Sequence, residues 1–210
     1  RLKLELANRL TAALGSEEDR WKEGIQSFTQ QREMLVGDCL LASAFISYIG
    51  PFTKDIRVDL INNVLTPLLT MPKVGKSIPM TENVDPIEVI VSEAEIAVFQ
   101  TEGLPSDKVS AENAAIVLSS VRYPLLIDPQ LQAITWIKKK EEKTLKLGRL
   151  GQSNLIKELL RAIEDGVPFL IENMGESIDP SLMPIISRMS IKRGSKKFIQ
   201  IGDAEVEINP

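Results

Sequence analysis

The sequence predicts an α/β fold in which a parallel sheet with flanking helices follows a long helical segment. Between residues 125 and 171, short apolar runs alternate with amphipathic helical patterns, and the connections between them are short. Strands joined through helices in this way pair in parallel by right-handed crossovers. The first 70 residues carry helical patterns only, so we expect the sheet in the later part of the chain.

Residues 1–35 favour helix throughout, because they contain no proline and only two glycines. Large apolar residues recur here at seven-residue spacing, and two more lie near the same stripe. They are Leu14, Trp21, Phe28 and Leu35, with Leu10 and Ile25. Such a heptad seam is buried against another helix. Two interpretations stay open: one strand of a coiled coil whose partner lies outside this chain, or an ordinary amphipathic helix packed on the local core.

Two more helices are expected before residue 71. Residues 36–49 are apolar on nearly all sides, which predicts a helix buried on most of its surface and ended by Gly50-Pro51. Residues 55–70 predict a second helix, broken at Thr66-Pro67.

A loop containing Pro72, Gly75 and Pro79 is expected over residues 71–85, and we place a domain boundary there. The following segment predicts a helix over 86–99, a turn at 103–105 and a helix over 111–121 with Ser110 as its N-cap.

The predicted core consists of three short apolar strands with helices between them. The strands are expected at 125–127, 145–147 and 169–171, and the helices at 131–142 and 154–165. A short helix is expected at 181–187, followed by a hairpin with a polar turn at Gly202-Asp203. The basic cluster at 192–197 suits either phosphate or an acidic partner, or a solvated shoulder of that hairpin.

Composition excludes several classes of function. The 210 residues are 43% hydrophobic and 26% charged, which is typical of a globular protein and not of a disordered chain. Histidine is absent, so nucleophile pairs and zinc sites that need it are impossible. With a net charge of −4 and no basic run interleaved with aromatics, we expect no nucleic-acid partner.

The remaining composition indicates a soluble intracellular protein. The longest apolar stretch, residues 39–49, is much shorter than the roughly 20 residues that a membrane span needs, so no membrane partner is expected. Cys39 is the only cysteine and makes no internal disulfide, which favours a reducing compartment. Because it lies in an apolar run, we expect a buried, reduced thiol.

Ligands of open α/β sheets bind at the carboxyl ends of the strands, so two loops are candidate sites. The loop after the first predicted strand carries an acid and a proline, where a phosphate-binding loop needs glycines, a lysine and a Ser or Thr. The third predicted strand ends in an acid, where nucleotide hydrolases place a magnesium ligand; it is also typical of a structural hydrogen-bonding residue. The degenerate candidate positions are Asp128, Pro129, Gln130, Gln132, Glu172 and Asn173. We assign no catalytic residue and no metal ligand.

Several blocks along the chain carry a family resemblance. They are LVGDCLLA at 35–42, YIGPFT at 48–53, GLPSD at 103–107, YPLLIDPQ at 123–130, WIK at 136–138 and IGDAEVE at 201–207. In this order they resemble dynein heavy chains around their fifth AAA+ module, over nearly the whole chain. The Asp-Pro-Gln and Trp-Ile-Lys blocks look more like the ciliary (axonemal) forms than the cytoplasmic one.

The resemblance implies a division of the chain and a mechanical function. Residues 1–35 would be the ring-proximal part of the returning stalk helix, 36–85 a helical small-subdomain and linker segment, and 86–210 a degenerate AAA+ (P-loop NTPase-like) large subdomain cut at its C-terminal end. It implies no cofactor in this segment, with ATP and Mg²⁺ in other modules of the parent chain.

The partners implied are other AAA+ modules, the opposing stalk helix, the microtubule through the stalk tip, and dynein intermediate and light chains. The implied location is the cytoplasmic cytoskeleton of a cilium or flagellum, in the axoneme. Two other functions stay open: a nucleotide hydrolase with an unusual phosphate loop that uses Glu172 for magnesium, and a coiled-coil adaptor with an α/β head.

Overall fold

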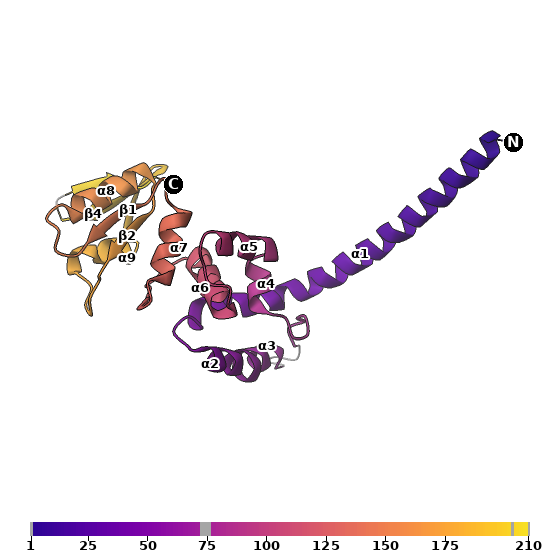
Figure 1. The fold of residues 1–210 in the computed structure, drawn as a ribbon, viewed down its shortest axis with the longest axis horizontal. Helices are drawn as coiled ribbons and strands as arrows, with labels where there is room; N and C mark the ends of the chain where they lie inside the picture. Colours follow the sequence, from indigo (N-terminus) through magenta and orange to yellow (C-terminus); the bar gives the residue numbers. More distant parts are fainter. Residues whose placement is uncertain (1, 72–76, 203, 210) are drawn as a thin grey trace. The chain divides into compact units, whose positions relative to one another are not determined.

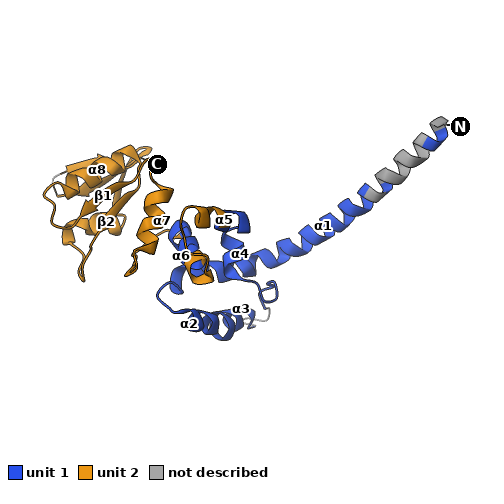
Figure 2. Cartoon of the chain, in the orientation of Figure 1, with its two compact units in different colours: residues 1–96, 112–119 blue, residues 97–111, 120–210 orange. Residues whose placement is uncertain are grey.

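A computed structural model describes residues 2–71, 77–202 and 204–209; within the first helix the side chains of residues 2–3, 6–14 and 16 lie outside the described part. The chain forms two compact units, residues 1–96 with 112–119 and residues 97–111 with 120–210 (Figure 2). Residues 86–96 group with the first unit, because Ile87 is buried in a short helix that packs on the first helix. The division into residues 1–35, 36–85 and 86–210 stays a prediction.

Helix α1 (Leu2–Tyr48) runs without interruption through both of the first two predicted helical stretches (Figure 1). Its C-terminal part is buried along one side only. The buried residues on this side are Leu41, Ala42 and Phe45, with Ile49 just after the helix. The prediction of a helix buried on most sides is therefore wrong, since the opposite face is exposed. Cys39 lies on that exposed face, so the expected burial of its thiol is also wrong.

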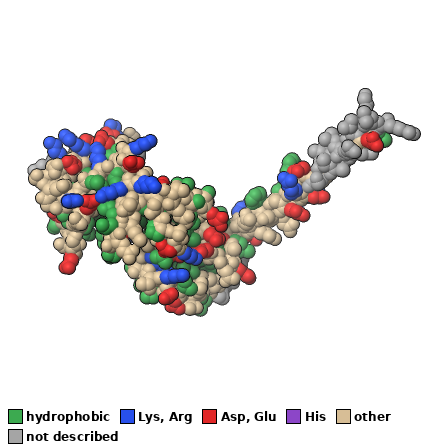
Figure 3. Space-filling view, viewed as in Figure 1, with side chains coloured by type: hydrophobic (Ala, Val, Ile, Leu, Met, Phe, Trp, Pro, Cys, Tyr) green, Lys and Arg blue, Asp and Glu red, His purple; other side chains and the backbone are tan. Residues whose placement is uncertain are grey.

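The predicted heptad seam lies uncovered on the described part of α1. Trp21, Ile25, Phe28 and Leu35 are 53% to 71% exposed, and Figure 3 shows hydrophobic side chains along this helix. Leu10 and Leu14, which complete the predicted seam, have side chains outside the described part. The described seam residues are thus not packed on a local core, which was one of the two interpretations of this pattern.

Residues 54–70 form one continuous helical segment, made of α2 (Lys54–Asp59), the π-helical η1 (Leu60–Leu65) and α3 (Thr66–Thr70). The predicted break at Thr66-Pro67 does not occur. The Thr66 N–H donates to the Ile61 carbonyl, five residues back, so the wider π turn leads into α3. Pro67, which has no N–H to donate, then lies in the first turn of α3 directly after the π turn.

Residues 77–85 form the described part of the predicted loop, whose Pro72 and Gly75 lie outside it. The single helix predicted over 86–99 is instead two, α4 (Pro86–Ile90) and α5 (Glu93–Thr101). The division occurs because Ser92 and Glu95 form a reciprocal capping box. The Glu95 carboxylate accepts the Ser92 N–H at 2.7 Å, and the Ser92 hydroxyl accepts the Glu95 N–H at 3.3 Å.

Helix α6 (Lys108–Ser119) follows the predicted turn, in which Gly103 has a φ of 100°. Its cap is Asp107 and not the predicted Ser110, because the Asp107 carboxylate accepts both the hydroxyl and the N–H of Ser110, at 2.6 and 2.9 Å. These bonds, the hydroxyl's first, hold the pKa of Asp107 below its ordinary value.

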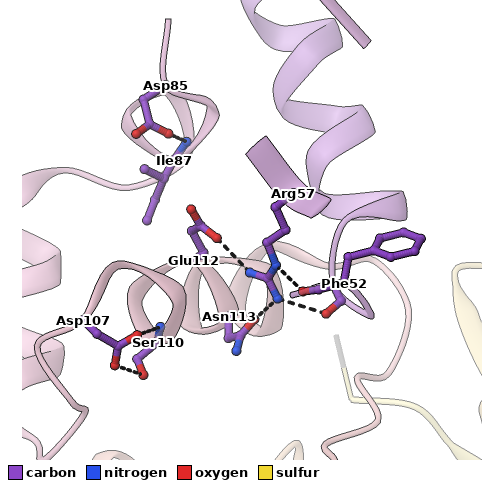
Figure 4. A network of polar contacts seen from close by, with 9 residues as sticks. Phe52, Arg57, Asp85, Ile87, Asp107, Ser110, Glu112 and Asn113 are labelled. Carbon is purple, nitrogen blue, oxygen red and sulfur yellow. Dashed lines mark hydrogen bonds and ion pairs between the residues drawn. The ribbon is translucent and has the colours of Figure 1, made fainter. Parts of the chain in front are cut away.

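A buried arginine joins the end of α1, α2 and the part of α6 that belongs to the first unit (Figure 4). Arg57 donates to Glu112 at 2.8 Å, to the Asn113 side-chain oxygen at 2.7 Å, and to the carbonyls of Phe52 and Gly50 at 2.7 and 3.0 Å. Because the guanidinium of Arg57 donates to all four of these acceptors, its positive charge is buried with hydrogen-bond partners.

The second unit contains the predicted parallel sheet. Strands β1 (Lys146–Arg149) and β2 (Phe169–Glu172) pair in parallel, with Lys146 opposite Phe169, and α8 (Leu155–Asp165) is the crossover between them. Helix α8 buries one apolar stripe and ends at Gly166, which adopts a φ of 66°. These elements confirm the predicted α/β class with a parallel sheet and helices.

The predicted first strand, at 125–127, is not a strand in the described residues. The segment has no regular structure, and Leu125 and Ile127 are exposed. A strand needs a neighbour that pairs its N–H and C=O groups, and the sheet of β1 and β2 does not include this segment. The apolar run therefore lacks the contact that its pattern implied.

After β2 the chain forms η2 (Pro180–Leu182) and α9 (Met183–Ile186), where a short helix was predicted. Strands β3 (Ser190–Arg193), β4 (Lys196–Ile201) and β5 (Ala204–Glu207) then make an antiparallel sheet. The hairpin predicted with a turn at Gly202-Asp203 is formed by β4 and β5, although Asp203 itself lies outside the described residues.

The basic cluster lies on the exposed strand β3 and the start of β4. Arg193 pairs with Glu205 at 3.0 Å, and Lys196 pairs with Glu207 at 2.7 Å, with all four side chains substantially exposed. Of the two interpretations left open by the sequence, the exposed position of this cluster agrees with the solvated shoulder of the hairpin. The buried side chains of this sheet and of α8, η2 and α9 form one core: Leu159, Leu160, Leu182, Ile185, Ile199, Ile201 and Val206. No helix in the described ranges is long and apolar enough to cross a membrane.

Candidate functional site

Helix α7 (Gln132–Lys140) lies between the two candidate loops in sequence, and a buried tryptophan fixes its position. Trp136 is almost fully buried, meets the Phe99 ring edge-on at 5.5 Å between centroids, and donates its indole N–H to Glu102 at 3.0 Å. Lys139 donates to the Thr101 carbonyl at 2.7 Å. Helix α7 is therefore held rigidly against the end of α5 within the second unit.

The first candidate loop places a carboxylate on the N-terminus of α7. Asp128 accepts the Gln132 N–H at 3.0 Å with one oxygen and the Ile134 N–H at 2.9 Å with the other. Leu131 adopts a left-handed conformation, with φ of 58°, between the turn and the helix. The loop thus closes on itself, with Asp128 as the acceptor for main-chain N–H groups of the first helical turn.

This arrangement does not fit a nucleotide phosphate. In phosphate-binding loops, main-chain N–H groups and the positive end of the helix dipole face the phosphate oxygens. Here the carboxylate of Asp128 already takes that place, so a phosphate would meet its negative charge and would have to displace it. Pro129 has no N–H to donate to a phosphate. Gln130 and Gln132 are uncharged, so they cannot neutralise one.

The second candidate loop begins at Glu172, whose carboxylate is held by two cations. Lys138 of α7 donates to one oxygen at 2.7 Å, and Arg149 of β1 donates to the other at 3.1 Å. The Glu172 side chain is 11% exposed. The hydrogen bond from Lys138 first, and then that from Arg149, hold the pKa of Glu172 below its ordinary value, so it stays ionised.

Glu172 therefore joins three elements, α7, β1 and β2. A magnesium ion at this carboxylate would have to compete with both Lys138 and Arg149. Asn173, the next candidate, is exposed and adopts a φ of 57° at the turn out of β2. Within the described ranges no three side chains of the metal-binding types come close enough to hold an ion.

Helix α7 makes hydrogen bonds to both candidate loops. Asp128 binds the N-terminus of α7, and Lys138 near its other end binds Glu172. Sequence reasoning named Asp128 and Glu172 but missed Lys138 and Arg149. No local signal could have found them, because they lie 34 and 23 residues from Glu172 and only the folded sheet brings them together.

Comparison with known families gives two matches along the chain. Residues 97–210 match the family described as the ATP-binding dynein motor region. Residues 1–69 match the family described as the microtubule-binding stalk of dynein motor. The first match covers more than half of the chain.

Individual relatives match over almost the full sequence. The chain is 48% identical over 207 residues to the ciliary dynein beta chain of Heliocidaris crassispina, and 45% identical over 207 residues to human dynein axonemal heavy chain 9. It is 46% identical over 209 residues to the dynein alpha chain of the flagellar outer arm of Chlamydomonas reinhardtii. Each match covers 99% of this chain and 4% of the relative, so the chain corresponds to a small part of these relatives.

Proposed function

Since this chain belongs to the dynein heavy chain family, we propose that it is a mechanical segment of an ATP-driven microtubule motor. In this proposal it joins a stalk helix to a ring module that neither binds nor hydrolyses nucleotide. The module would pass strain between its neighbours, while hydrolysis takes place in other modules of the parent chain. The resemblance of the sequence blocks supports the fifth AAA+ module as the ring module of this proposal.

One observation carries the proposal, the carboxylate of Asp128 on the N-terminus of α7. Its two oxygens accept main-chain N–H groups that a phosphate loop would direct at nucleotide. Glu172 supports it, because Lys138 and Arg149 bind the carboxylate that would otherwise hold magnesium. The chain's own charges thus take the place of both the phosphate and the metal.

The uncovered seam of α1 supports the stalk assignment of residues 1–35. Its large apolar side chains have no cover in the described chain, although exposed aromatic residues at heptad spacing favour burial against another helix. The partner proposed is the opposing stalk helix of the same heavy chain. Residues 36–85 would then be the small subdomain and linker, and 86–210 the degenerate large subdomain.

The remaining proposed partners follow from the family. They are other AAA+ modules of the heavy chain, the microtubule through the stalk tip, and the intermediate and light chains of the complex. The names of the relatives place them in cilia and flagella, so the proposed location is the axoneme of the cytoskeleton.

Calorimetric titration with ATP and with ADP, each with Mg²⁺, tests the non-hydrolysing assignment. We expect no heat of binding at micromolar nucleotide for the unaltered chain or for Glu172→Gln. Glu176→Gln, an exposed acid in the same loop, is the matched control. Micromolar binding that disappears in Glu172→Gln and persists in Glu176→Gln would overturn the proposal and favour the hydrolase.

Fluorescence of the two tryptophans tests the stalk assignment, because Trp21 is exposed and Trp136 is buried. In a Trp136→Phe background only Trp21 reports in the present chain, and in the longer segment every added tryptophan is replaced by phenylalanine. We expect acrylamide to quench Trp21 strongly in the present chain and weakly in a longer heavy-chain segment that includes the opposing stalk helix. Equal quenching in the two would contradict the pairing.

A further inference from the structure

Helix α1 changes character at Gly37. Before this residue its described large apolar side chains are exposed, apart from the half-buried Met34, and from Leu41 onward one side packs into the core of the first unit. The segment 77–81 crosses α1 at this point. A Cβ atom added to Gly37 would lie 2.3 Å from the Pro79 carbonyl oxygen and 2.6 Å from the Met80 Cβ, so the two backbones meet without room for a side chain.

The neighbouring residue fastens the same crossing. The Asp38 carboxylate accepts the Thr81 N–H at 2.8 Å with one oxygen and the Thr81 hydroxyl at 2.7 Å with the other. Both bonds have an ionised acceptor, which makes them stronger than neutral hydrogen bonds. Close backbone contact and a double hydrogen bond therefore hold one point of α1 against one point of a segment 43 residues further along the chain.

We propose that Gly37 and Asp38, with residues 79–81, form a clasp that fixes the axial position and rotation of α1 where its exposed part meets the packed part of the first unit. The crossing selects one position on α1 only if no second residue of this helix fits there. Its other glycines are Gly15 and Gly24, at distances of 22 and 13 residues.

Sliding that keeps the same face of a helix inward moves it by 3, 4 or 7 residues, about 4.5 to 10.5 Å along its axis. Each such step toward either end of α1 brings a residue with a Cβ under the Pro79 carbonyl. Those residues are Met34, Glu33, Gln30, Leu40, Leu41 and Ala44. The clasp therefore accepts a single register.

If residues 1–35 pair with a second helix, a change of register between the two must come from that helix, or from bending of α1 before Gly37. The part of α1 that follows the clasp stays in place. The clasp itself stands on contacts within the first unit, and does not depend on the proposed function.

Two alanine substitutions in the same helix test the clasp. Gly24→Ala adds a methyl group into open space, with nothing within 4 Å, and should leave the first unit unchanged or more stable. Gly37→Ala should force the crossing apart. We expect amide hydrogen exchange of residues 77–85 to rise about tenfold or more in Gly37→Ala and to stay unchanged in Gly24→Ala, since exchange follows local opening.

The native Cys39 and a cysteine at Glu88, both exposed, allow a register measurement by spin-label distances. We expect one narrow distance distribution in the chain with Gly37 and Gly24 unaltered and in Gly24→Ala. In Gly37→Ala we expect the distribution to be broader or shifted. If Gly37→Ala does not fold, Asp38→Ala removes both hydrogen bonds without a clash and should give the same faster exchange, whereas Thr81→Val removes only the hydroxyl bond and should give a smaller increase. Unchanged exchange in 77–85 and an unchanged distance distribution in the folded variants would overturn the clasp.

Discussion

Each unit of this chain contains a carboxylate held by cationic side chains, and the two centres differ in burial. In the first unit, the side chains of Arg57 and Glu112 are 3% and 8% exposed. In the second, Glu172 is 11% exposed, but its partners Lys138 and Arg149 are 42% and 63% exposed. In the first centre both charged side chains are shielded from water. In the second centre the carboxylate is shielded, but its two cations are exposed.

The difference decides what each centre contributes. A buried charge that loses its partner cannot be rehydrated, so breaking the Arg57 centre leaves an uncompensated charge. An exposed cation that loses its partner returns to water with little penalty. We therefore infer that the Arg57 centre specifies how the first unit is assembled, whereas the Glu172 centre fixes α7 to the sheet more weakly.

The largest expected effect is that of Arg57→Met. Removing the guanidinium leaves Glu112 buried without a counter-ion, which should lower the free energy of unfolding by about 3–5 kcal/mol. Urea denaturation followed by circular dichroism measures it. Lys54→Met, at an exposed position of the same helix, is the control and should change stability little. Equal effects of the two substitutions would contradict the closed character of this centre.

The second largest effect is a partial recovery in the double variant Arg57→Met with Glu112→Leu. Replacing both charges removes the orphaned carboxylate, so the double variant should be more stable than Arg57→Met by roughly 1 kcal/mol or more. It should not reach the unaltered chain, because the Gly50 and Phe52 carbonyls and Asn113 also lose a donor. A double variant less stable than Arg57→Met would show that the carboxylate is not the source of the loss.

Glu172→Gln should have a smaller effect that depends on pH. The pKa of Glu172 is lowered in the folded chain, so its charge stabilises the fold above the ordinary glutamate pKa. That stabilisation is lost as the pH falls through the lowered pKa. We expect a loss of about 1 kcal/mol at pH 7 that shrinks toward about pH 3, measured by urea denaturation at both. A loss that is independent of pH would contradict an ionic role.

The smallest effect is expected for Lys196→Ala. Its ion pair with Glu207 joins two half-exposed side chains, and such pairs stabilise proteins by less than about 1 kcal/mol. Thermal unfolding should therefore be nearly unchanged, in contrast to the other variants. A loss comparable to that of Arg57→Met would mean that the hairpin is covered in a way that its exposure does not indicate.

Much of the fold could be predicted because it depends on local patterns. The apolar stripe of α8 and the glycine that ends it identified that helix within one residue, and the apolar run at β2 identified the strand. The single helix expected over 86–99 was wrong although a local signal existed, since Ser92 and Glu95 have the spacing of a capping box.

The remaining errors concern contacts between distant residues. Leu125–Ile127 has the composition of a buried strand, but pairing depends on a neighbour that no local pattern supplies. Cys39 lies in an apolar run, yet the helix turns it to the open side. At the candidate site, the acid and proline after residue 127 predict a loop that disfavours phosphate, and this stays a prediction. That Asp128 would bind the first turn of α7 was not anticipated, although an aspartate just before a helix has the means to do so.

The clasp at Gly37 also determines how far the part of α1 before it can tilt. The 35 residues from Leu2 to Val36 extend about 52 Å at 1.5 Å per residue, so this stretch is a lever arm pivoting at the clasp. A tilt of about 5° at the pivot would move the far end by about 4–5 Å over that length. Small adjustments in how residues 79–81 contact the helix would thus become displacements nearly as large as the pitch of one helical turn, about 5.4 Å.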